Sequence, residues 1–154
     1  MDNLYHVVNA LPPVDNAFAG TVATIPINMS MWGHCSFLIH CGAGAVGTAR
    51  ITVEACSDTV PTATVPVQFY YQECISGDTF SDIQWTPDTT GFTTSAAADK
   101  VYKVEVDSRM LDAAGFKYVR LKSVEQVVGA ITGSVVAVLT EGRISSTVPA
   151  SCIV

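Results

Sequence analysis

The feature that most constrains the fold of this chain is an alternation of apolar and polar residues with a period of two. It is clearest in Thr48–Cys56. The apolar positions of this segment are Ala49, Ile51, Val53 and Ala55, and the polar ones are Thr48, Arg50, Thr52 and Glu54. Successive side chains of a strand point to opposite faces of a sheet, so this pattern predicts a β-strand with one face in the core.

Similar alternation recurs along the chain, whereas no long segment has a helical period. The other predicted strands are 21–25, 34–41, 65–71, 102–106, 116–121 and 135–140, the last a β-branched run expected to be buried on both faces. One short helix is expected at 108–114, capped by Asp107 or Ser108 and closed by Gly115. About eight short strands separated by turn residues predict an all-β fold, an antiparallel, jelly-roll-like β-sandwich.

The first twenty residues differ from the rest in composition. They mix Asn, Pro and Asp with short apolar pieces, and Pro12-Pro13 should interrupt regular strand pairing. We therefore expect an extended N-terminal arm over residues 1–20 and a single sandwich domain over residues 21–154. The arm should dock on its own domain or on a neighbour through its apolar side chains, which are Leu4, Tyr5, Val7 and Val8.

Charged side chains are scarce, at 14% of residues against about 25% in an average soluble domain. Much of the surface must then be apolar or neutral, which is typical of a subunit that contacts other chains. The net charge is −6, and the eight Lys and Arg residues are scattered singly. Nucleic-acid binding needs clustered cations, so we expect no direct contact with nucleic acid.

The sequence also bears on the compartment. No stretch is long and apolar enough to predict a membrane span, and the opening MDNLYHVV lacks the cationic start of a secretory signal. The five cysteines are odd in number and have no C-x-x-C spacing, which favours buried thiols over a disulfide framework. These features predict a protein made in a cytoplasm.

Three glycines, Gly42, Gly44 and Gly47, spell G-x-G-x-x-G after an apolar run, the pattern of a dinucleotide-binding loop. That loop binds a phosphate only when its third glycine opens a helix with free N-terminal amides. The residues after Gly47 instead have the period of a strand. A glycine-rich turn between two strands is therefore the preferred interpretation.

Two His-Cys pairs, His34-Cys35 and His40-Cys41, suggest zinc ligands. Neighbouring residues of a strand point to opposite faces, and six strand residues span about 20 Å, whereas zinc ligands lie about 2.0–2.3 Å from one ion. We expect no metal site here unless the segment bends or a second chain contributes. No nucleophile motif such as G-x-S-x-G occurs, so we predict no enzyme and no cofactor.

The polar stretch between residues 76 and 99 leaves two alternatives open. Its aspartates Asp78, Asp82 and Asp88 form a solvated acidic loop or a weak calcium site. Trp85, together with Tyr70 and Tyr71 just before the stretch, could form a sugar-stacking platform on the sandwich.

Five segments of the chain resemble small virion proteins of tailed phages and prophages, of the head decoration (cement) type. They are 11–15, 37–56 with its glycine loop, 67–71, 102–106 and 118–121. The resemblance implies a sandwich without active-site residues that forms dimers or trimers on the capsid surface.

The resemblance and the composition together predict a non-enzymatic virion protein that binds the lattice of the major capsid protein. We expect it on the capsid surface after assembly in the host cytoplasm. A lectin-like or tail-associated module of a phage particle is the alternative. The residues expected at the contact are Leu4, Tyr5, Val7, Val8, Phe80 and Trp85.

Overall fold

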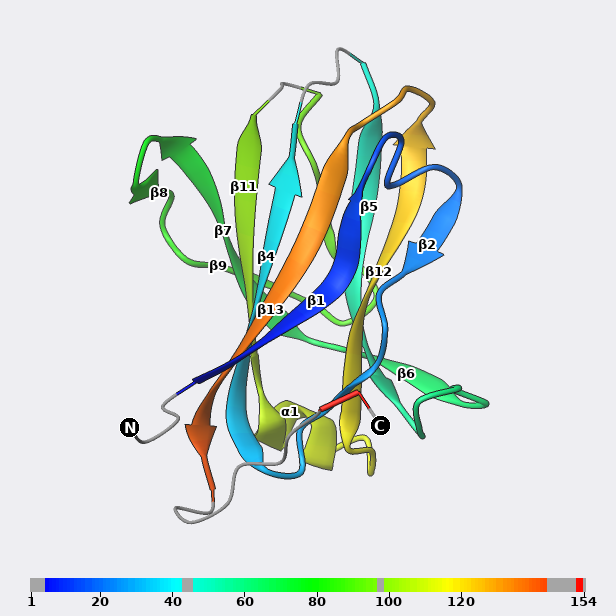
Figure 1. The fold of residues 1–154 in the computed structure, drawn as a ribbon, viewed down its shortest axis with the longest axis vertical. Coiled ribbons are helices and arrows are strands. Elements are labelled where there is room, and N and C mark those ends of the chain that lie inside the picture. The colour runs from blue at the N-terminus through cyan, green and yellow to red at the C-terminus, as the bar shows by residue number, and fades with distance from the viewer. Residues whose placement is uncertain (1–4, 43–45, 97–98, 144–151, 154) are drawn as a thin grey trace.

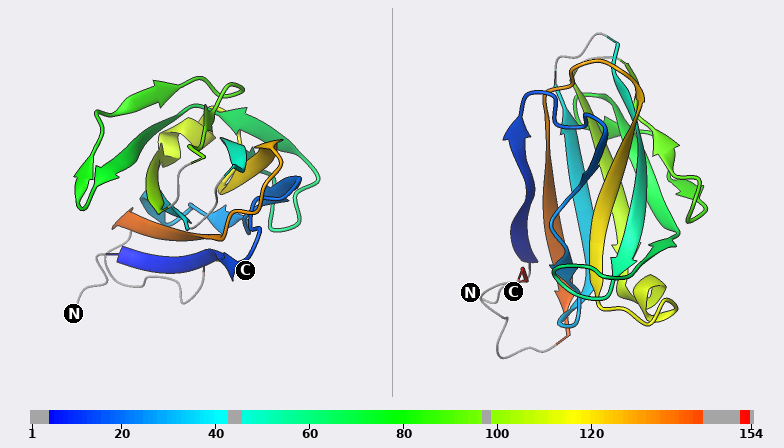
Figure 2. Two further views of the ribbon diagram at one scale, coloured as in Figure 1. Left: turned by 90° about the horizontal axis from the view of Figure 1, so that it is seen from above. Right: turned by 90° about the vertical axis from the view of Figure 1, so that its right-hand side faces the viewer.

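The computed structural model describes residues 5–42, 46–96, 99–143 and 152–153. Within these residues, thirteen strands and one short helix form two antiparallel sheets packed face to face (Figures 1 and 2). This arrangement confirms the predicted all-β sandwich. The strand number exceeds the expected eight, partly because the polar stretch 76–99 contains three strands of two or three residues.

The seven-stranded sheet has the order β1-β13-β4-β11-β7-β8, and β9 also pairs with β7. Its members are β1 (Tyr5–Val14), β13 (Gly133–Gly142), β4 (Trp32–Cys41), β11 (Lys100–Asp107), β7 (Phe69–Ser76), β8 (Thr79–Phe80) and β9 (Gln84–Thr86). Strands β4 and β13 pair along nearly their whole length, and they form the middle of this layer with β11.

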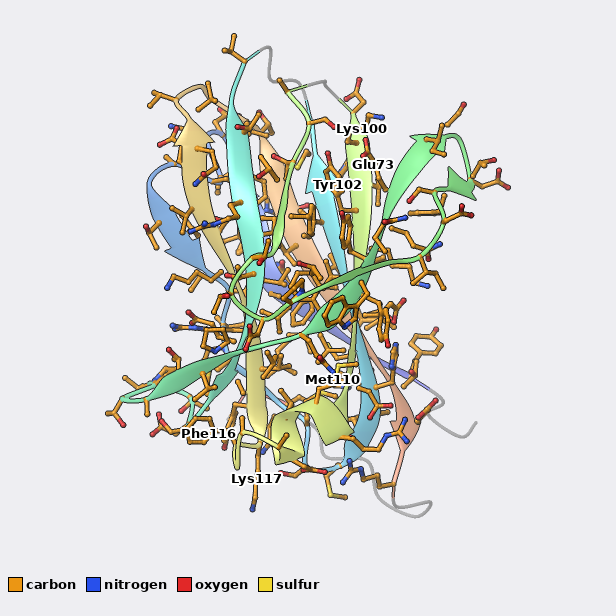
Figure 3. All side chains as sticks on the ribbon, turned by 180° about the vertical axis from the view of Figure 1, so that it is seen from behind. Glu73, Lys100, Tyr102, Met110, Phe116 and Lys117 are labelled. Carbon is orange, nitrogen blue, oxygen red and sulfur yellow. The ribbon has the colours of Figure 1, made fainter. Side chains whose placement is uncertain are left out.

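The six-stranded sheet has the order β10-β5-β12-β2, with β3 also paired to β12 and β6 to β5. Its members are β10 (Phe92–Thr93), β5 (Thr48–Cys56), β12 (Tyr118–Val127), β2 (Thr21–Ala23), β3 (Ile27–Asn28) and β6 (Thr64–Val67). The segment 65–71, predicted as one strand, is split at Gln68: β6 belongs to this sheet and β7 to the other. The chain therefore crosses between the layers as one long diagonal (Figure 3).

The core lies between the inner faces of the sheets. On β4, Cys35, Phe37 and Ile39 are fully buried, while Ser36 and Leu38 between them are partly exposed on the outer face. Strand β13 alternates in the same way, so the expectation that 135–140 is buried on both faces is wrong. The reason is that no second layer covers the outer face of β13 in the described part of the chain.

Within residues 1–20, the segment expected to form an arm, Tyr5–Val14 form strand β1, which pairs with β13 of its own domain. The ladder is irregular between Asn9 and Val14, around the two prolines. Val8 and Ala10 are buried in the core at 5% and 2% exposure, whereas Tyr5 and Val7 face outward. Leu4 lies outside the described residues.

The helix α1 (Ser108–Asp112) is shorter than the predicted 108–114. Its first turn is capped as expected, because the Arg109 backbone N–H donates to Asp107 Oδ1 over 2.9 Å. Gly115 follows the helix with a φ of 72°, a left-handed conformation that glycine adopts without strain. The helix closes one end of the sandwich beneath the β6–β7 diagonal, where Figure 3 labels its residue Met110.

Candidate contact surface

The glycine-rich loop forms a close backbone contact and opens no helix. Strand β5 begins at Thr48, directly after Gly47. A Cβ on Gly47 would overlap the carbonyl oxygen of Gly129, in the loop between β12 and β13. Gly44 lies outside the described residues. The third glycine therefore lets two neighbouring loops approach each other, as the preference for a turn between strands implied.

His34 and His40 share the outer face of β4, as predicted, but His34 is engaged by a carboxylate. Its Nε2 atom contacts Oε2 of Glu105 on β11. Ser36 Oγ donates to the same oxygen over 2.9 Å, and Lys103 Nζ lies 2.6 Å from Glu105 Oε1. We call His34, Ser36, Lys103 and Glu105 the Glu105 cluster.

The protonation of the Glu105 cluster follows from these contacts. Partial burial alone would raise the pKa of Glu105, but hydrogen bonds from His34, Lys103 and Ser36 outweigh it and hold the pKa at about 2. The hydrogen bond to Glu105 likewise raises the pKa of His34 above its usual value. The charges neutralise one another across β4 and β11, so the cluster is best explained as an ion network that stabilises this strand pair.

Two exposed aromatic side chains lie side by side on the outer face of the same sheet. Tyr70 on β7 is the register partner of Trp85 on β9, and the two side chains are 40% and 54% exposed. Ile83, just before β9, is 67% exposed. We call Tyr70, Ile83 and Trp85 the aromatic edge. Register partners share a face of a sheet, so Tyr70 and Trp85 form one apolar surface, and Ile83 lines a hollow together with Tyr70.

Tyr71 does not join the aromatic edge, although all three aromatic residues were considered as one platform. It points to the other side of β7, where its ring stacks on Phe92 at a centroid distance of 4.3 Å. Phe69 packs in the same group of rings. The structure therefore brings together Tyr70 and Trp85 and packs the partly buried Tyr71 against the core.

Two hollows flank the aromatic edge. An open groove of about 830 Å³ runs between β6, the segment after β9 and α1, and Trp85, Val65 and Met110 line it. Asp107 and Arg109 also line it and form an ion pair with an N–O distance of 2.7 Å. The second hollow, of about 460 Å³, is lined by the Glu105 cluster, Tyr70, Tyr71, Gln72 and Ile83.

The described residues hold no group of three or more His, Cys, Asp or Glu side chains arranged to bind a metal ion, and Asp78, Asp82 and Asp88 form none. All five cysteines, each in the described part of the chain, are free thiols; four are buried and Cys74 is partly exposed. In the same ranges, no helix has the length and hydropathy needed to cross a membrane.

Comparison with solved structures finds proteins of similar fold. No family model matches the chain, and no curated protein matches it. The fold resembles the crystal structure of the SPBc2 prophage-derived protein YomS, with a TM-score of 0.50 and 11% sequence identity. The match covers 89% of this chain and 93% of that one, so the likeness is in the whole sandwich and not in one motif.

The predicted contact residues separate onto opposite edges of the seven-stranded sheet. Tyr5 and Val7 lie on β1 at one edge, and Phe80 and Trp85 lie on β8 and β9 at the other. Phe80 is partly buried. Val8 is a core residue, so its expected role in a contact with another chain is wrong: in a strand, it points opposite to Val7.

Sequence reasoning missed Ile83 and the Glu105 cluster. The sequence could have pointed to Ile83 as a contact residue, because it is an apolar residue two positions before Trp85 in a polar stretch. The sequence gives no indication that His34 contacts Glu105, because these residues are 71 positions apart and meet only through the register of β4 with β11.

Proposed function

We propose that this chain is a non-enzymatic structural protein of a phage particle, which decorates the head by binding the lattice of the major capsid protein through its aromatic edge. The observation that carries this proposal is the exposure of Tyr70, Ile83 and Trp85 together on one sheet margin. Large exposed apolar surfaces on soluble domains mark contacts with other proteins. The shared fold with a prophage-derived protein supports a phage context.

The mechanism is burial of apolar area, with no chemical step. Each Å² of apolar surface removed from water contributes about 25 cal/mol before the costs of association. A single contact of this kind is modest, but a closed shell repeats it many times. The net charge of −6 favours the outer surface, because a protein facing packaged DNA needs cations to contact phosphates.

Trp85 is the expected anchor of the contact. Tryptophan is among the residues that dominate binding energies when they enter a pocket on the partner. Trp85 stands beside the groove along α1, so part of a capsid protein that fills this groove would also cover the indole ring. We expect Trp85→Ala to weaken head binding by about 30-fold, which corresponds to a loss of about 2 kcal/mol.

Co-sedimentation with purified phage heads that lack their own copies of the protein tests this proposal. The wild-type chain should pellet with the heads and saturate them, and Trp85→Ala should shift the binding curve as stated. Val60→Ala is the matched control, because Val60 is 79% exposed and lies in the turn between β5 and β6. Absence of wild-type binding, or equal weakening by both variants, would contradict the proposal.

A second candidate, carbohydrate binding, is favoured by one specific observation. Trp85, the cross-strand partner of Tyr70, lines a groove that also carries polar groups suited to sugar hydroxyls, those of Gln68, Asp88 and Arg109. A glycan array distinguishes the two functions. Oligosaccharide binding that is lost in Trp85→Ala, together with no binding to heads, would favour the lectin-like function.

A further inference from the structure

Strand β1 is an unusually long edge strand. The other strands at the margins of the two described sheets are short: β2 and β9 have three residues, β3, β8 and β10 have two, and β6 has four. β1 has ten. Short edge strands are a common protection against unwanted pairing between chains, because an exposed edge offers unpaired N–H and C=O groups. β1 lacks this protection.

Among the described residues, part of the outer edge of β1 has no partner strand. The Ala10 carbonyl accepts a hydrogen bond from the Ile25 N–H over 3.2 Å, so pairing beyond this point is blocked. From Tyr5 to Asn9, β13 is the only strand of the described residues that pairs with β1, and the other edge of β1 stands at the margin of the molecule in Figure 2. Alternate residues of an antiparallel edge strand direct their N–H and C=O groups outward.

The side chains of β1 also suit a contact between chains. Tyr5–Val14 contains no Asp, Glu, Lys or Arg, although the whole chain carries a net charge of −6. Strand β1 therefore lacks the lysines and other charged residues that prevent natural edge strands from pairing with another chain. Tyr5 and Val7 are 62% and 54% exposed on the outer face. Two copies can meet along this strand without the repulsion that their acidic surfaces cause elsewhere.

We propose that β1 pairs with β1 of a second copy, antiparallel about a twofold axis at Val7. A twofold contact places the same strand against itself, so one uncharged strand supplies both sides. The open stretch runs from Tyr5 to Asn9 and its centre is Val7, so Val7 lies opposite its own copy and Tyr5 opposite Asn9. The two seven-stranded sheets then join into one continuous sheet.

Disulfide trapping tests the register of this pairing. Directly opposite residues of an antiparallel pair have Cβ atoms about 4.5–5.5 Å apart, close enough for a disulfide after small adjustments. Val7→Cys, made in the full chain with Cys74→Ser to remove the partly exposed native thiol, should form a covalent dimer on mild oxidation. The matched control Val60→Cys in the same background should stay monomeric on a non-reducing gel.

Sedimentation equilibrium tests the pairing itself. The wild-type chain should sediment at twice its 16.3 kDa monomer mass, and Val7→Lys should halve that mass while Val60→Lys leaves it unchanged. Circular dichroism confirms that each variant is folded. A monomeric wild-type chain, or a Val7→Lys dimer, would overturn the pairing. These measurements use no heads, so their failure is distinct from failure of the proposed function.

Discussion

Among single residues, Gly47 and Gly129 show how a motif that suggests nucleotide binding serves packing. Their backbones lie so close that a Cβ on Gly129 would stand 2.6 Å from the Gly47 nitrogen. Gly42, in the same motif, has more room: its added Cβ would meet the Thr132 carbonyl oxygen at 3.4 Å, an ordinary contact. Of the two described glycines of the motif, Gly47 therefore leaves no room for a side chain, whereas Gly42 does.

We expect Gly47→Ala to lower the free energy of unfolding by about 1–3 kcal/mol, because the methyl group forces the β4–β5 and β12–β13 loops apart. Gly42→Ala, the control within the same motif, should change it by less than about 1 kcal/mol. Urea denaturation followed by circular dichroism measures both. Equal effects of the two substitutions would contradict the close contact at Gly47.

The Glu105 cluster should make stability depend on pH in a defined way. The pKa of Glu105 is about 2 when folded, below its ordinary value of 4.5, so its contribution is complete above pH 4.5 and is lost as the pH falls toward 2. The pKa of His34 is raised from 6.5, so its contribution is complete below pH 6.5 and is lost as the pH rises through its folded value.

Between pH 4.5 and pH 6.5, Glu105→Gln should therefore lower the free energy of unfolding by about 1–2 kcal/mol. The difference from wild type should shrink below pH 4.5. In NMR titrations the same variant should move the pKa of His34 downward. Asp82→Asn, at an exposed acid, serves as the control, and an unchanged His34 titration in Glu105→Gln would refute the pairing.

At the scale of elements, the most consequential finding is that β1 belongs to the sheet. Val8 and Ala10 fill the core and the strand pairs with β13. Deleting residues 1–13 should therefore cost at least about 3 kcal/mol of unfolding free energy, because it removes buried apolar area and a row of backbone hydrogen bonds. Thermal denaturation measures this loss. Deletion of residues 1–4 alone leaves β1 complete and is the control, and equal melting temperatures for both deletions would contradict the structure.

The sequence predicted the strands with one buried face well, because burial imposes the period of two directly. β5 matches its predicted bounds, β4 begins two residues early, and β11 begins two residues early and ends one residue late. The sheet change at Gln68 was not predictable from this signal, since the alternation continues unbroken across it. Pairing partners were also hidden, because register is a long-range property. The aromatic edge was predicted in part: Tyr70 and Trp85 were named together, but Ile83 was missed and Tyr71 was wrongly included, because the face on which each side chain lies depends on that register.

For the whole molecule, the two proposals describe one arrangement. The aromatic edge and β1 lie at opposite margins of the same sheet. A dimer joined through β1 would therefore carry one aromatic edge at each end of a continuous sheet. Two such sites on one rigid body bind a repeating lattice more strongly than either site alone, provided their spacing fits the lattice. A protein of this shape would bridge neighbouring capsid subunits.

A cryo-electron microscopy reconstruction of phage heads saturated with the wild-type chain tests this arrangement most directly. We expect density for the sandwich at regular positions over the outer shell, with Trp85 and the groove along α1 against the capsid protein and β1 paired with β1 of a second copy. Density at the tail alone, or a capsid contact made through another face with Trp85 exposed to solvent, would contradict it.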